Sequence, residues 1–165
     1  MTEERLRRLV RAWLVTGLTD AVFSSVLVSV FYGSTVARLW QGVASVLLGP
    51  DALNGGTRTV LIGLLMHFGV ALAWSTVFLI LYMRSEWVRN ESSTLGGALK
   101  VAAIYGPCIW IVMSFIVIQS LTHKPPTINF RWWVQFVGHI PFVAVPIVTS
   151  IARPVRSRAL RLAAQ

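Results

Sequence analysis

Charged residues are scarce in this chain of 165 residues. Aspartate and glutamate together number 6, lysine and arginine 15, and charged residues make up 13% of the composition. A soluble domain normally carries about 25% charged residues, so a surface with so few could not be kept in contact with water. Together with a hydrophobic content of 55% and a mean hydropathy of +0.68, this scarcity excludes a soluble enzyme and indicates a membrane protein.

Cysteine is almost absent as well. Cys108 is the single cysteine, which excludes an internal disulfide framework and any zinc or iron–sulfur site built on several cysteines. The sequence also contains no G-x-S-x-G nucleophile motif and no phosphate-binding P-loop. Nothing in it therefore names a reaction, and we expect a protein without enzymatic activity.

Long uncharged segments predict four membrane-spanning helices. Arginine and lysine residues bracket segments of about residues 12–33, 59–83, 98–121 and 131–152. A helix rises 1.5 Å per residue and needs about 20 apolar residues to cross roughly 30 Å of hydrocarbon. The continuously apolar run from Val60 to Met66 lacks the alternation of a barrel strand. The sequence thus predicts an all-α fold: one membrane domain over residues 1–165, built as a four-helix bundle.

A shorter amphipathic helix is expected over residues 36–48. Its apolar residues recur at helical spacing, which favours a helix lying in the outer membrane interface with its apolar face toward the lipid. A re-entrant or partner-facing helix is the alternative. The apolar residues are Val36, Leu39, Trp40, Val43, Val46 and Leu47.

The distribution of cations predicts the orientation. Most lysine and arginine residues flank the two chain ends and the loop between spans two and three, which places both termini in the cytoplasm. The net charge of +9 then reflects topology and attraction to anionic lipid headgroups; because the cations form no single patch, we do not expect a nucleic-acid partner. The cytoplasmic cations are Arg5, Arg7, Arg8, Arg11, Arg84, Arg89, Lys100, Arg153, Arg156, Arg158 and Arg161.

Three ionisable residues fall inside the predicted spans: Asp20, His67 and His139. Such groups are costly in hydrocarbon and often mark a functional site. Counted from the nearest cation at the end of each span, all three lie at a similar depth, which for the two histidines is about 12–14 Å below the outer face. Whether they face one another cannot be read from their spacing.

Three functions fit these residues. Polar side chains can simply bridge neighbouring helices, each contributing about 0.6–2 kcal/mol, in a structural or accessory subunit. His67 and His139 could instead be the two axial ligands of a b-type haem. Asp20 could form a proton or small-solute path with a histidine, because imidazole titrates near neutral pH.

Small residues at i+4 spacing favour the first of these functions. Gly17, Ala21 and Ser25 form one such row, and Ala98, Ala102 and Gly106 form another. In lipid, close backbone approach at small residues holds helices together. We therefore expect a non-enzymatic accessory subunit that packs against other membrane-protein subunits or copies of itself.

Four segments resemble a known group of proteins. They are Gly17-Leu-Thr-Asp20, Gln41-Gly-Val-Ala-Ser-Val-Leu-Leu-Gly49, Leu65-Met-His-Phe68 and Gly138-His-Ile-Pro141. In these segments the chain is similar to small four-span proteins of the bacterial inner membrane, broadly YagU-like, whose function is unassigned. The resemblance implies a multi-pass protein of the bacterial plasma membrane and places both span histidines in shared segments, and it implies no activity.

Overall fold

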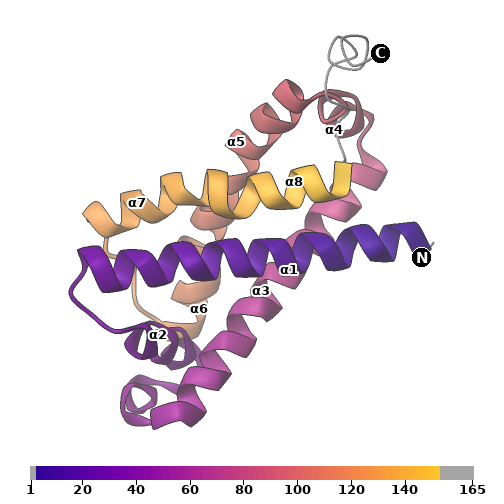
Figure 1. Ribbon diagram of the computed structural model, residues 1–165. Coiled ribbons are helices and arrows are strands. Elements are labelled where there is room, and N and C mark those ends of the chain that lie inside the picture. The colour runs from indigo at the N-terminus through magenta and orange to yellow at the C-terminus, as the bar shows by residue number, and fades with distance from the viewer. Residues whose placement is uncertain (1–2, 153–165) are drawn as a thin grey trace.

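The computed structural model describes residues 3–152, and helices make up almost all of this part of the chain (Figure 1). No strand occurs among the described residues. Three short segments, η1, η3 and η4, are wider π-helical turns, and η2 is a 3₁₀-helix. In chain order the elements are α1 (Glu3–Val26), η1 (Leu27–Phe31), α2 (Val36–Leu48), η2 (Pro50–Asn54), α3 (Gly56–Arg84), α4 (Glu86–Glu91), α5 (Leu95–Val112), η3 (Met113–Ile118), α6 (Gln119–Thr122), α7 (Phe130–His139), η4 (Ile140–Ala144) and α8 (Val145–Ala152).

Four helical runs are long and apolar enough to cross a membrane, which confirms the predicted all-α, multi-pass architecture. They are Glu3–Phe31, Gly56–Arg84, Leu95–Thr122 and Phe130–Ala152. The first run differs most from its predicted bounds, because it begins at Glu3 rather than at residue 12. Ion pairs of 2.6 Å join Glu3 to Arg7 and Glu4 to Arg8, one turn apart, and acidic residues in a first turn complement the helix dipole.

Polar caps set where three other helices begin. The side chain of Thr35 accepts a hydrogen bond from the backbone of Arg38, Thr94 from Gly97, and Asn129 from Trp132. Each cap satisfies a backbone N–H that the first helical turn leaves without a partner. These caps explain why α2 begins at the predicted residue, and why α5 and α7 begin slightly before the residues predicted for them.

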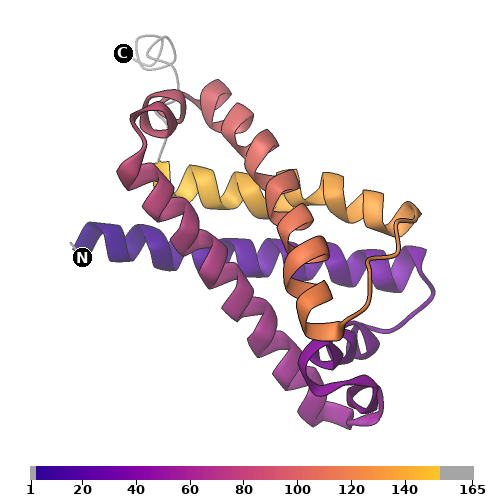
Figure 2. The same cartoon turned by 180° about the vertical axis from the view of Figure 1, so that it is seen from behind.

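The four runs do not form a parallel bundle. The run from α7 to α8 lies antiparallel along α1, while α3 and α5 cross this pair obliquely (Figures 1 and 2). Arg8 donates a 2.9 Å hydrogen bond to the carbonyl of Ile151, so the first and last described turns lie together. We call this the terminal end; it also holds α4. The predicted cytoplasmic cations of the C-terminal tail, Arg153, Arg156, Arg158 and Arg161, lie outside the described residues.

A dry apolar core fills the terminal end. Small residues let the helices approach closely there: Ala12 of α1, Ala98 and Ala102 of α5, and Ala144 of η4 have no exposed surface. Large side chains then fill the remaining space, among them Phe78, Ile109, Ile147, Val148 and Ile151. These side chains bury one another between the helices, so an apolar core occupies this end of the molecule.

The second helix packs partly against the bundle. Trp40 and Ala44 are buried, and α2 packs against α3, where the hydrogen of Gly63 faces the backbone carbonyl of Trp40. Leu39, Trp40, Val43 and Val46 line the interior of the bundle, whereas Val36 and Leu47 of the same apolar face are exposed. This packing also encloses polar residues described below. The location of α2 at the outer interface stays a prediction.

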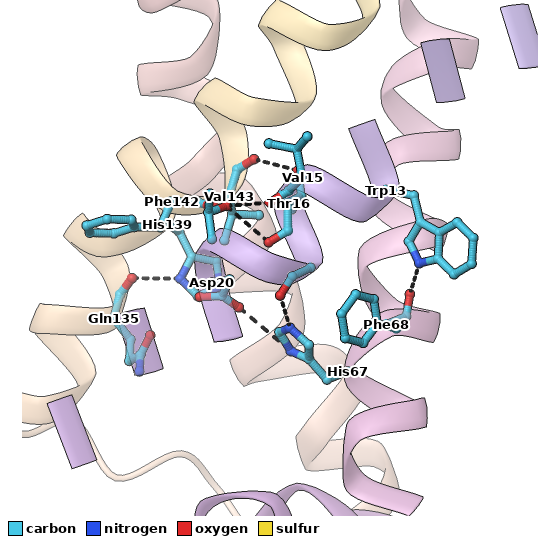
Figure 3. A network of polar contacts seen from close by, with 12 residues as sticks. Trp13, Val15, Thr16, Asp20, His67, Phe68, Gln135, His139, Phe142 and Val143 are labelled. Carbon is cyan, nitrogen blue, oxygen red and sulfur yellow. Dashed lines mark hydrogen bonds and ion pairs between the residues drawn. The ribbon is translucent and has the colours of Figure 1, made fainter. Parts of the chain in front are cut away.

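A tryptophan joins α1 to α3. The Nε1–H of Trp13 donates a 2.8 Å hydrogen bond to the carbonyl of Phe68, whose ring meets the indole edge-on (Figure 3). We expect Trp13→Phe to lower the free energy of unfolding in detergent by about 0.6–2 kcal/mol, since it deletes the donor and keeps most of the apolar surface. Trp87→Phe is the matched control, because Trp87 is 59% exposed; equal losses in both variants would contradict the assignment.

Candidate functional site

Asp20 and His67 meet where α1 crosses α3. Gly17, one turn before Asp20, lies against the ring of Phe68, and any side chain there would collide with that ring. The close approach lets His67 Nε2 come within 2.9 Å of the Gly17 carbonyl oxygen, while His67 Nδ1 lies 3.8 Å from Asp20 Oδ2 (Figure 3). Both side chains are mostly buried, with 13% of the His67 side chain and 17% of the Asp20 side chain exposed.

The contact with Gly17 shows which nitrogen of His67 carries a hydrogen. A carbonyl oxygen can only accept, so Nε2 carries a hydrogen and donates it to Gly17. The other nitrogen, Nδ1, then faces a carboxyl group. At 3.8 Å this nitrogen and Asp20 Oδ2 lie beyond hydrogen-bond distance but within the distance of an ion pair. Asp20 and His67 therefore form a close, mostly buried pair of groups that can each bind a proton.

His139 lies on the other side of Asp20 (Figure 3). Its Nδ1 is 2.7 Å from the carbonyl oxygen of Gln135, one turn earlier in α7, so Nδ1 donates and Nε2 is the free nitrogen of the neutral ring. The ring packs 4.8 Å from the indole of Trp110. Gly106 of α5 makes this position possible, since a Cβ there would come within 2.7 Å of the His139 carbonyl oxygen.

Asp20, His67 and His139 line one cavity of about 540 Å³, which we call the central cavity. The three residues are named the Asp20 centre below, and Asp20 lies between the two histidines (Figure 3). Their common depth was predicted from the sequence, and the structure brings them together. The volume lies in the range of about 300–1,000 Å³ typical of sites for small molecules.

Two rows of residues carry polar groups along the central cavity. The α1–η1 row places one residue per turn on the wall: Thr16, Asp20, Ser24, Val28 and Tyr32. The α7–η4 row does the same from the antiparallel helix: Arg131, Gln135, His139 and Val143. Apart from Asp20 and His139, sequence reasoning missed these residues, although their i+4 spacing is visible in the sequence. The rest of the wall is mainly apolar, with side chains of α2, α3, α5 and η3.

The rim of the central cavity, at the end opposite the terminal end, carries positive charge. Arg131 and Arg38 both line the cavity there, and the Arg131 guanidinium lies 4.3 Å above the ring of Tyr32. Arg38 donates a 3.0 Å hydrogen bond to the carbonyl of Leu53. No carboxylate pairs with either arginine among residues 3–152. The rim can therefore attract an anion.

Three buried polar atoms of cavity-lining residues have no hydrogen-bond partner within the described part of the chain. They are Asp20 Oδ1, the Trp110 indole nitrogen and the Tyr32 hydroxyl. An unsatisfied buried polar group typically costs about 1–3 kcal/mol, so native proteins seldom tolerate several in one place without a ligand, water or proton to satisfy them. The other such atoms in the described residues, on Ser75, Ser92, Ser114 and Trp132, belong to residues that do not line the central cavity.

The π-helical segments also gather at this cavity. Val28 of η1, Met113 of η3 and Val143 of η4 all line it, and η4 begins directly after His139. Such wide turns are rare and frequently occur at functional sites. Neither η1 nor η3 contains proline or glycine, so no residue in the sequence marks them.

The predicted haem ligands share the cavity, but their surroundings suit a haem poorly. Both nitrogens of His67 face oxygen atoms, so iron ligation would require the bond to Gly17 or the contact with Asp20 to break. Gly63 and Gly138 could have left space for a porphyrin; instead they face the Trp40 backbone and the ring of Phe23. Across residues 3–152 no group of three or more His, Cys, Asp or Glu residues could hold a metal ion.

The small residues named as helix-packing rows are used largely within the chain. Ala98 and Ala102 belong to the terminal-end core, Gly106 contacts the backbone of His139, and Gly17 contacts Phe68. They therefore give no independent sign of a neighbouring subunit. Comparison of the chain with protein-family models, with curated proteins and with solved structures finds no match, so the resemblance to YagU-like proteins stays a prediction.

Proposed function

We propose that this multi-pass membrane protein carries protons through the Asp20 centre, which lies in a cavity that can also take a small solute. The observation that carries the proposal is the placement of Asp20 between two imidazoles inside the central cavity. Carboxyl and imidazole groups within the membrane are the usual components of proton relays in transporters. Asp20 lies between the rings of His67 and His139, so a proton can pass from one ring to the other by way of its carboxyl group (Figure 3).

The route from the rim to the Asp20 centre supports this function. Ser24 and Gln135 continue the two polar rows between Asp20 and the rim, so water molecules find hydrogen-bond partners on that side of the cavity. The core at the terminal end closes the other half of the molecule. Transport thus requires a second arrangement in which that core opens, while the Asp20 centre remains the shared binding site.

Proton flux into vesicles tests the proposal. Purified protein is reconstituted with a pH-sensitive dye inside, and an outward potassium gradient with valinomycin drives proton entry. We expect faster acidification than in protein-free vesicles, and a loss on the order of 100-fold in His67→Gln, because glutamine can still donate to Gly17 but cannot carry the proton.

His123→Gln is the matched control, because His123 lies in the loop after α6 and does not line the cavity. It should leave the flux unchanged. Equal flux in the wild type and in His67→Gln would contradict the proposal.

The orientation and location remain part of the proposal. We infer that the terminal end faces the cytoplasm of a bacterial inner membrane, because the predicted cytoplasmic cations of the described residues gather at the terminal end, from Arg5 to Arg11 and from Arg84 to Lys100. The support is the distribution of charge and the four apolar runs.

Two other functions from the sequence stay predictions. An accessory subunit would be extracted from the membrane by mild detergent as part of a larger assembly. Mass measurement of the extracted species detects this assembly. A bis-histidine haem protein would show a Soret band that disappears in His67→Ala and in His139→Ala. Neither function requires a carboxyl group between two imidazoles.

A further inference from the structure

The rim and the walls of the central cavity differ in chemistry. At the rim stand the guanidinium groups of Arg131 and Arg38 and the hydroxyl of Tyr32, which has no partner among the described residues. Below the rim, the cavity is bounded mainly by aliphatic side chains. They include Leu39, Val43, Val46, Val117, Ile118 and Leu121. A ligand that satisfies both parts must carry an anionic group on an apolar body.

We propose that the solute is a single-chain organic acid, with its carboxylate at the rim and its apolar chain along the cavity toward the Asp20 centre. This proposal rests on the proposed function and names the solute of the same site. Guanidinium binds carboxylate through paired, charge-assisted hydrogen bonds, which is why Arg131 and Arg38 point to this headgroup. A cationic ligand would meet two positive charges before it reached Asp20.

The dimensions of the site limit the chain length. Arg131 and His139 are eight positions apart on one helical row, which corresponds to a rise of about 12 Å. An extended medium-chain acid such as decanoate is about this long. A cavity of about 540 Å³ holds one such chain, whereas a two-chain phospholipid would have to stay outside it.

The ring of Tyr32 positions the guanidinium of Arg131 at the rim. Its guanidinium stacks on the ring of Tyr32 at 4.3 Å, and this contact leaves the N–H groups at the edge of the guanidinium plane available. A carboxylate can bind to that edge while the stacking persists. The rim is therefore arranged before the acid arrives, which reduces the entropy lost on binding.

Decanoate binding to the full chain in phosphatidylcholine nanodiscs tests the inference. Trp40 and Trp110 line the cavity, so their fluorescence reports occupancy. We expect saturable binding of decanoate, at least about tenfold weaker binding of decanol and decylamine, and about tenfold weaker binding of decanoate in Arg131→Gln. Arg131→Lys should recover part of the affinity by keeping the charge.

Arg58→Gln is the matched control, since Arg58 begins α3 near the same end but does not line the cavity. Equal affinities for decanoate in the wild type and in Arg131→Gln, or tighter binding of decylamine than of decanoate, would overturn the inference. So would a response to phosphatidylglycerol in the nanodisc without one to decanoate, because it would place the anion site in the surrounding lipid. If proton flux persists in Asp20-intact protein while decanoate fails to bind, the solute assignment falls and the proton function stands.

Discussion

Asp20→Asn is expected to abolish proton flux through this protein, with a loss on the order of 100-fold relative to the wild type. Asparagine keeps the shape of the side chain and can donate a hydrogen bond to His67 Nδ1, so the crossing of α1 and α3 should survive. It cannot carry a proton between the two imidazoles. The measurement is the acidification rate of proteoliposomes at equal protein content, as for the wild type.

Asp51→Asn is the control for this variant. Asp51 lies in η2 near the rim end, outside the lining of the central cavity, so its replacement removes the same charge without touching the Asp20 centre. We expect its flux to match the wild type. Retention of wild-type flux in Asp20→Asn would remove Asp20 from the proton path.

Gly63→Ala is expected to destabilise the protein by about 1–3 kcal/mol or more. The added Cβ would collide with the backbone carbonyl of Trp40, and a backbone atom cannot move aside as the end of a flexible side chain can. The helices α2 and α3 would have to separate, which opens the cavity wall formed by Trp40 and Val43. Thermal unfolding in mild detergent measures the loss.

Gly69→Ala, in the same helix, is expected to stabilise the protein rather than destabilise it. Nothing lies within 4 Å of a Cβ placed at Gly69, so the substitution adds only helix propensity. Replacing glycine by alanine inside a helix typically stabilises it by about 0.5–1 kcal/mol. A similar loss of stability in both variants would show that α2 does not pack on α3 as described.

The sequence predicted the fold because the bilayer imposes a strong rule on it. Backbone polar groups must be paired inside hydrocarbon, and only helices and closed barrels pair all of them. An uncharged run such as 59–83 without the alternation of a barrel strand is therefore expected to form a helix. The run observed, Gly56–Arg84, extends that prediction by a turn at most at either end. Depth was equally readable, since counting residues from a cation places Asp20, His67 and His139 at similar levels.

The depth of a residue in the membrane does not predict which neighbouring helix its side chain faces, because it does not specify the rotation of the helix about its axis. The face of α1 that meets His67 depends on the contact of Gly17 with Phe68, and the position of His139 depends on Gly106, two close approaches between residues far apart in sequence. The same limit applies to α2. Its apolar face suits lipid and protein equally well, and the choice is made by the fit of Trp40 against Gly63.

The π-helical segments were unpredictable for another reason. The sequence contains helix breakers at Pro107 and Pro141, yet α5 continues through Pro107, and two of the three π segments contain no such residue. Their wide turns follow from packing around the central cavity rather than from local preference. By contrast, the polar rows from Thr16 to Ser24 and from Arg131 to His139 could have been found by searching the spans for polar residues at i+4 spacing.

Nitrogen NMR of the imidazole rings in labelled protein tests most directly whether His67 and Asp20 interact as a pair. The chain has 3 histidines, so each ring can be assigned by substitution. We expect His67 Nε2 to carry a hydrogen that it donates to Gly17, and the His67 Nδ1 signal to change in Asp20→Asn. A His67 ring with a bare Nε2 and a protonated Nδ1 that is unaffected by Asp20→Asn would contradict the account.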